Sequence, residues 1–162
     1  MTKLLVLSDS HGGRAAIERV LMKESKSIDA LIFLGDGLRD LELALTLYPK
    51  LRAYSVAGNC DYGALEPTDG LAAFDGVVIF YTHGHMYGVK YDLDTLADAA
   101  SAGCRGGAVR SHPHPPCRDP QQGVFVQPRL LRPVLHRAGH LRHPDAGRSK
   151  VTAYEHKEVP KQ

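Results

Sequence analysis

Four short groups of residues in the first half of the chain carry side chains that bind divalent metal ions. In chain order they are Asp9-Ser10-His11, Gly35-Asp36, Gly58-Asn59-Cys60-Asp61 and Thr82-His83-Gly84-His85. They offer carboxylate and amide oxygens together with imidazole nitrogens, a mixed set that suits manganese, iron, nickel or zinc better than calcium. Two ions that share a carboxylate activate a bound water near neutral pH, so these residue types predict hydrolytic chemistry at a two-metal site.

A predicted β-strand precedes each of the four groups. The first two strands are continuously apolar, which is typical of strands buried on both faces. In an open α/β sheet, ligands bind beyond the carboxyl ends of the strands, so we expect one cleft to collect the polar side chains. Asp36, in the tight Gly35-Asp36-Gly37 turn, is the candidate for the shared carboxylate. The predicted strands cover Lys3–Ser8, Ala30–Leu34, Leu51–Ala57 and Val77–Tyr81.

Predicted helices alternate with the first three strands. Apolar residues recur at helical spacing within Arg14–Lys26, and a second helix over Leu38–Tyr48 is ended by Pro49. Asp92 is expected to cap a third helix over Leu93–Ala102. The alternation of strands and helices predicts a mostly parallel sheet with helical cover.

The other regular segments predict antiparallel strands. The dipeptide Asp75-Gly76 separates Leu71–Phe74 from Val77–Tyr81 and favours a two-residue hairpin turn, which suggests a second sheet. Near the end of the chain, Val151–His156 alternates like an edge strand.

The size and composition of the chain are those of one ordinary globular domain. Its 162 residues are enough to bury a core, and 43% hydrophobic and 23% charged residues are typical values. The apolar run that follows Lys3 is too short for a signal peptide or a membrane span, so a cytoplasmic location is expected. Cys60, Cys104 and Cys117 form neither a disulfide framework nor a paired zinc motif.

Each polar group taken alone has an ordinary structural explanation. An Asp-x-His sequence after a strand is more often a helix cap than a ligand pair, and Gly35-Asp36-Gly37 is typical of a turn. His83 and His85 alone fit loop residues that bond to the backbone. Cys60 is expected to be a packed small residue, because no catalytic base motif accompanies it. The conjunction of the four groups, in order and after strands, favours a metal site.

Residues 3–85 resemble the calcineurin-like metallophosphoesterase superfamily, and within it the small YfcE-type phosphodiesterase branch. The pattern of that family runs D-x-H, GD, GN-x-D, a THGH-like segment and finally GH-x-H, and the chain matches its first four parts. The resemblance implies an α/β fold with two mixed β-sheets sandwiched between helices. It also implies that Asp9 and His11 bind a first metal, that Asp36 bridges both metals, and that Asn59 and His83 bind the second.

The function implied by the resemblance is metal-dependent hydrolysis of a small phosphoester, most of all a phosphodiester. Two divalent ions are implied, with Mn2+ favoured over Ni2+, Fe2+ or Zn2+. No membrane partner is expected, and a homo-oligomer stays open. A competing class is a catalytically impaired scaffold that binds metal without turnover. A Rossmann-type nucleotide-binding protein is disfavoured, because no G-x-G-x-x-G follows the first strand.

One departure lies inside the matching region. Many members of the superfamily have a histidine after the asparagine, placed to protonate the leaving group, whereas this chain has Cys60. The difference predicts a preference for substrates with good leaving groups. His85 is the candidate substitute for the catalytic acid, and Asp61 is the candidate for a residue that orients the metal ligands.

The last third of the chain differs in character from the rest. Residues 1–103 carry nine Lys and Arg against fourteen Asp and Glu, giving −5, whereas residues 104–150 carry nine against two, giving +7. After Gly103, the expected end of the third helix, neither helical nor strand periodicity is visible until about residue 150. We therefore expect residues 104–148 to be irregular and poorly packed.

The fifth part of the family pattern is absent in its usual form. His112-Pro113-His114 keeps the His-x-His spacing, so His112 and His114 are candidate metal ligands, but the flanking prolines restrict the backbone. One possible DNA sequence that encodes Val109–Pro115 gives the peptide F-G-H-T-H-I when it is translated from its second base. Similar shifts of Val126–Leu131 and Gly139–Pro144 give other family-like segments. A frameshift spanning about residues 104–148 is the favoured hypothesis.

Two further explanations of this segment are weaker. An arginine-rich tail binds nucleic acid through phosphate contacts, but here it has one aromatic residue, Phe125, and no recognition motif, so nucleic acid is disfavoured as a partner. Cys104, His112, His114 and Cys117 have a spacing that matches no common zinc site.

Overall fold

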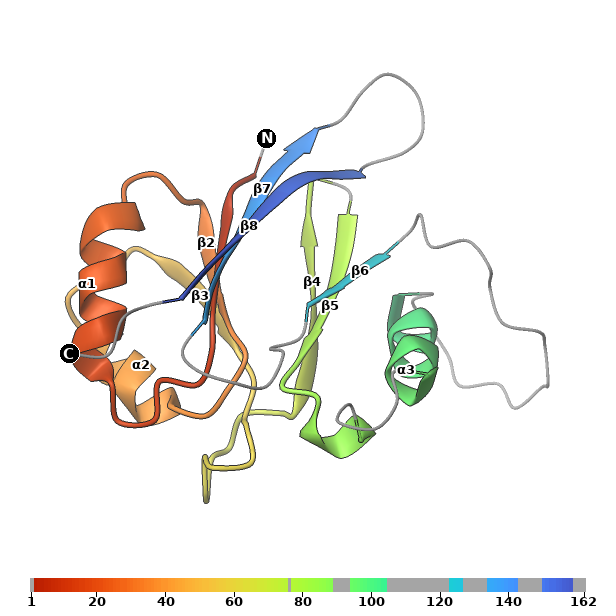
Figure 1. Ribbon diagram of the computed structural model, residues 1–162, viewed down its shortest axis with the longest axis horizontal. Coiled ribbons are helices and arrows are strands. Elements are labelled where there is room, and N and C mark those ends of the chain that lie inside the picture. Colours follow the sequence, from red (N-terminus) through yellow and green to blue (C-terminus); the bar gives the residue numbers. More distant parts are fainter. Residues whose placement is uncertain are drawn as a thin grey trace.

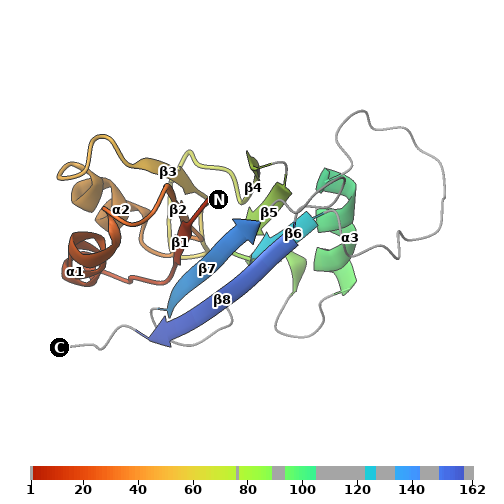
Figure 2. The same cartoon turned by 90° about the horizontal axis from the view of Figure 1, so that it is seen from above.

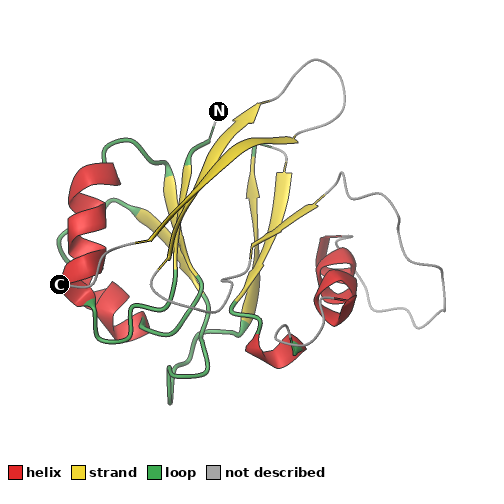
Figure 3. Ribbon diagram, in the orientation of Figure 1, coloured by secondary structure: helices red, strands yellow, loops and turns green. Residues whose placement is uncertain are grey.

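The computed structural model describes residues 2–75, 77–88, 94–104, 123–126, 134–142 and 150–158. Two β-sheets face each other, with two helices outside the first sheet and one helix outside the second (Figures 1 and 3). This arrangement confirms the predicted sandwich of two sheets between helices. Among the described residues, no helix is long and apolar enough to cross a membrane.

The first sheet has the strand order β3-β2-β1-β7-β8. Its parallel part consists of β1 (Leu4–Leu7), β2 (Ala30–Phe33) and β3 (Arg52–Ser55), in which Leu4 pairs with Ala30. β7 (Val134–Arg142) is antiparallel to β1, and β8 (Lys150–Glu158) pairs with β7 along its length (Figure 2). The expected edge strand near the end of the chain is therefore confirmed as β8.

Both faces of β1 and β2 are buried, which explains their continuous apolar runs. One face packs against α1 (Arg14–Glu24) and α2 (Leu38–Leu45) through residues such as Leu5, Leu21 and Leu41. The opposite face packs against the second sheet, where Val6 and Ile32 share a cluster with Ile79. Because successive strand residues point to opposite faces, a single run supplies both cores.

The second sheet has the order β4-β5-β6. β4 (Asp69–Phe74) and β5 (Val77–Thr82) form the predicted hairpin, and Asp75 has the positive φ of 47° that a primed turn requires. β6 (Gly123–Val126) is parallel to β5. α3 (Asp94–Cys104) covers this sheet, and the short 3-10 helix η1 (His85–Tyr87) follows β5.

The prediction of irregular structure over residues 104–148 is wrong for β6 and β7. Strand pairing needs only backbone N–H and C=O groups, so it does not require alternating side chains, and β1 offers a free edge to β7. The prediction that Gly103 ends the third helix is also wrong, since α3 extends to Cys104. Asp92, the expected cap of that helix, lies outside the described residues.

Candidate metal centre

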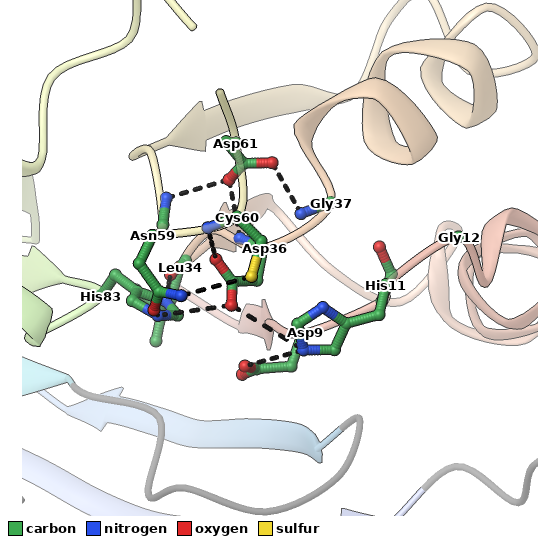
Figure 4. Close-up of polar contacts among 12 residues, drawn as sticks. Asp9, His11, Gly12, Leu34, Asp36, Gly37, Asn59, Cys60, Asp61 and His83 are labelled. Carbon is green, nitrogen blue, oxygen red and sulfur yellow. Dashed lines mark hydrogen bonds and ion pairs between the residues drawn. The ribbon is translucent and has the colours of Figure 1, made fainter. Parts of the chain in front are cut away.

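Five of the predicted metal ligands meet where β1, β2, β3 and β5 end (Figure 4). Nε2 of His11 lies 3.6 Å from Oδ1 of Asp9 and 3.8 Å from Oδ2 of Asp36. Nε2 of His83 lies 3.7 Å from the same Oδ2 atom and 3.1 Å from Oδ1 of Asn59. The Asp36 carboxylate therefore stands between two histidines, as its predicted role as the shared ligand requires.

Three of these residues have a positive backbone φ angle, which residues other than glycine seldom adopt. Asp9, His11 and Asp36 have φ values of 56°, 45° and 59°. Such a conformation costs on the order of 1–3 kcal/mol for a residue other than glycine, and it persists at functional sites where the surroundings enforce it. Here the loops enforce it on each other, because Asp9 N–H donates to Gly35 O at 2.9 Å and His11 N–H to Asp36 O at 3.0 Å.

Two glycines let the Asp36 loop and the Asn59 loop approach closely. A Cβ atom on Gly35 would lie 2.4 Å from the backbone nitrogen of Gly58, and one on Gly58 would lie 2.1 Å from Oδ1 of Asp36. No side chain fits in either place. The glycine in each of these two sequence motifs is therefore a requirement of packing at the centre.

Asp61 braces the same two loops. Its carboxylate accepts hydrogen bonds of 2.7–2.9 Å from the backbone N–H groups of four residues, namely Asp36, Gly37, Leu38 and Gly58. Two of these donors, in Gly37 and Leu38, lie at the N-terminus of α2, so Asp61 also caps that helix. Partial burial by itself raises the pKa of Asp61, but the backbone N–H groups outweigh it and lower the pKa. Asp61 therefore holds the two loops together, and its predicted role in orienting the metal ligands stays a prediction.

A second carboxylate, which the sequence analysis missed, braces the loop that carries Asp9 and His11. Asp40, in the first turn of α2, accepts hydrogen bonds from Oγ of Ser10 at 2.7 Å and from N–H of Gly12 at 2.8 Å. The available signal was an acidic residue in the first turn of the helix that follows Gly35-Asp36.

The surroundings of His83 test whether this centre fits a cation. Nδ1 of His83 lies 2.7 Å from the carbonyl oxygen of Leu34, and because a carbonyl only accepts, Nδ1 carries the proton. In the neutral ring Nε2 then has a lone pair, and this lone pair faces the oxygens of Asn59 and Asp36. Three electron-pair donors that converge in this way are stabilised by a positive ion.

The separations also fit metal coordination. Two ligands that each lie about 2.1 Å from one ion are at most about 4.2 Å apart. The His11–Asp36 distance of 3.8 Å and the His83–Asp36 distance of 3.7 Å are within this span. Two groups of three residues have ligand atoms that all lie within 4.8 Å of one another. The first group is His11, Asp36 and Cys60, and the second is Asp9, Asp36 and His83.

The remaining candidates have different positions. The His85 ring lies edge-on against His83 with centroids 5.3 Å apart, and its buried Nδ1 has no hydrogen-bond partner among the described residues. Burial and then the neighbouring His83 lower the pKa of His85, against an opposing effect of Asp36. Cys60 is exposed rather than packed, which corrects that expectation. His112 and His114 lie outside the described residues.

The fold and the centre agree with a comparison against known families. Residues 2–150 match the model of the calcineurin-like phosphoesterase superfamily domain, and the chain belongs to this family. The match includes all five residues predicted above as metal ligands and extends through most of the last third of the chain. The predicted membership is thereby confirmed.

Individual relatives are similar over part of their length. The probable metallophosphoesterase YsnB of Bacillus subtilis is 33% identical over 91 residues, which are 56% of this chain and 51% of that protein. A conserved uncharacterized protein of Streptococcus pneumoniae, described as a predicted phosphoesterase, is 26% identical, with a TM-score of 0.54 over 63% of this chain and 56% of its own. The chain thus spans about half the length of these two relatives.

A third likeness covers nearly the whole chain and concerns the fold alone. The structure of an archaeal phosphodiesterase aligns with a TM-score of 0.57 over 97% of this chain and 99% of its own, at 14% identity. The two-sheet architecture is therefore shared beyond the first half of the chain.

Proposed function

We propose that this protein is a metal-dependent phosphoesterase that hydrolyses small phosphodiesters. Two divalent metals, when bound, would supply an activated hydroxide and would neutralise charge on the phosphoryl oxygens. The observation that carries the proposal is the position of the Asp36 carboxylate, whose Oδ2 lies within coordination reach of both His11 and His83. Family membership supports the same class of reaction.

The proposal gives each residue of the centre a defined task. Asp36 holds both metal positions, Asp9 and His11 complete one, and Asn59 and His83 complete the other. Mn2+ is the favoured ion, with Ni2+, Fe2+ and Zn2+ as alternatives. His112 and His114 are proposed as further ligands.

In the proposed hydrolysis, protonation of the leaving group is the step that the residues of this centre support least. Burial lowers the pKa of His85, so its protonated form, the one able to donate, is populated only below the ordinary histidine range. With Cys60 in place of a histidine, we therefore expect turnover of phosphodiesters with good leaving groups, and weak activity on alkyl esters near neutral pH.

The test is hydrolysis of bis(p-nitrophenyl) phosphate by the full chain with added Mn2+. Asp36→Asn is the matched control, because it keeps the size of the side chain and removes the charge shared by the two positions. We expect turnover that requires metal and falls by about a thousandfold or more in the variant, since both ions are affected. Equal turnover of the two proteins would contradict the proposed centre.

A catalytically impaired scaffold is the alternative, and the altered His112-Pro113-His114 motif favours it. Folded protein that binds Mn2+ without hydrolysing the substrate would support it. Resequencing the gene across codons 100–150 shows whether a frameshift altered the motif, because an intact reading frame would exclude the frameshift.

A further inference from the structure

The sulfur atom of Cys60 lies among the ligands of the metal centre. Its Sγ atom, a nitrogen of His11 and an oxygen of Asp36 are all within 4.8 Å of one another. Figure 4 shows the sulfur beside the Asp36 carboxylate, on the side that faces the His11 ring. Two neighbouring hydrogen bonds fix this position: Cys60 N–H donates to Oδ1 of Asp36 at 2.8 Å, and Nδ2 of Asn59 donates to the sulfur at 3.2 Å.

We propose that Cys60 is a metal ligand, and that its sulfur completes the position held by His11 and Asp36. The inference rests on the proposed two-metal centre and adds a donor that the sequence pattern does not assign. As the metal–sulfur bond forms, the S–H bond breaks and its proton passes to solvent. The N–H group of Asn59 remains directed at the resulting thiolate.

Other roles for Cys60 agree less well with the structure. A packed small residue would be buried, whereas Cys60 is exposed. A nucleophile needs an adjacent base and a lowered pKa. Desolvation, a side-chain hydrogen bond to Asp36 and the charges of Asp36, Asp61 and Asp9 instead raise the pKa of this thiol.

A sulfur ligand makes the two metal positions chemically different. Thiolate is a soft donor that favours zinc and cobalt, whereas carboxylate, amide and imidazole donors also accept the harder manganese ion. The position of His11, Asp36 and Cys60 is therefore expected to prefer Zn2+, one of the alternative ions named above, to Mn2+. Within the described part of the chain, the position beside Asn59 and His83 has oxygen and nitrogen donors alone.

Cobalt spectroscopy tests the proposal without relying on activity. The protein used is the full chain with Cys104→Ser and Cys117→Ser, so that Cys60 is the single thiol. Titration with Co2+ is expected to produce visible d–d bands together with a near-ultraviolet thiolate-to-cobalt charge-transfer band. A further Cys60→Ser change is expected to remove the charge-transfer band and to keep d–d absorption from the other position.

The outcomes separate this proposal from the proposed function. Cobalt binding that depends on Asp36, accompanied by metal-dependent hydrolysis but by no charge-transfer band, would overturn the role of Cys60 and leave the enzyme intact. Absence of any cobalt binding would overturn both proposals.

Thiol labelling gives a second measurement that needs no change at Cys60. In the same single-thiol protein, saturating Zn2+ is expected to slow the reaction of the exposed thiol with a disulfide reagent by about tenfold or more, because a metal-bound thiolate is a poorer nucleophile. Asp36→Asn should lose this protection. Labelling at the same rate with and without Zn2+, in protein that has bound the ion, would refute the proposed ligand.

Discussion

The two halves of the candidate metal centre differ in how firmly the surrounding residues hold them. His83 is 8% exposed, and its ring is fixed by Leu34 and Asn59, while Asp61 braces the loops beside it through four backbone N–H groups. His11 is 48% exposed, and the bracing carboxylate of Asp40 receives two hydrogen bonds, one from a side chain and one from the backbone.

The difference predicts that the two candidate metal positions bind their ions with different affinities. The half that contains His83 is rigid and preorganised, so a metal ion there meets ligands that lose little freedom on binding. The half that contains His11 is open to solvent and depends on a more lightly braced loop. We therefore expect the first ion to bind beside His83 and the second, more weakly, beside His11.

Removal of the firmer brace should have the largest effect. Asp61→Ala leaves four backbone N–H groups without their charged acceptor and is expected to destabilise the fold by about 3 kcal/mol. Denaturant unfolding of the metal-free protein measures this change. Asp61→Asn is the matched control and should lose only part of it, because the amide oxygen still accepts. Unchanged stability in Asp61→Ala would show that these loops hold without the brace.

The two histidines should respond unequally to truncation. His83→Ala removes a buried ring with a 2.7 Å bond to Leu34 and is expected to cost about 2 kcal/mol of stability before any metal is added. His11→Ala removes a half-exposed ring and should cost less than about 0.5 kcal/mol. Thermal unfolding of both variants without metal makes the comparison. Equal losses would mean that the two halves are equally rigid.

Removal of the lighter brace should affect stability less than removal of Asp61 and should have a selective effect on metal binding. Asp40→Ala is expected to cost about 1 kcal/mol, since the groups it frees are near solvent. It should weaken the second of two metal-binding steps by about tenfold, as loss of an orienting partner typically does, and leave the first unchanged. Calorimetric titration with Zn2+ resolves the two steps, and a weakened first step would reverse the assignment.

Much of the fold could be predicted because the strands that matter are buried on both faces. The apolar runs Leu4–Leu7 and Ala30–Phe33 bury every side chain, which is possible for a strand at the centre of a sheet that is covered on both faces. The hairpin at Asp75 followed from its turn chemistry. The strand Val134–Arg142 was missed, because its pairing with β1 uses backbone groups that leave no pattern in the sequence.

For the candidate site, the sequence determined the order and type of the candidate ligands, because the ends of the strands bring Asp9, Asp36, Asn59 and His83 to one edge. Tertiary structure decided what holds them. Asp40 reaches Gly12 across 28 residues and Asp61 reaches Asp36 across 25, and the sulfur of Cys60 lies beside a carboxylate from another loop. Such contacts depend on how loops meet in space, since a backbone N–H group has the same chemistry at every position and only its place in the fold selects its partner.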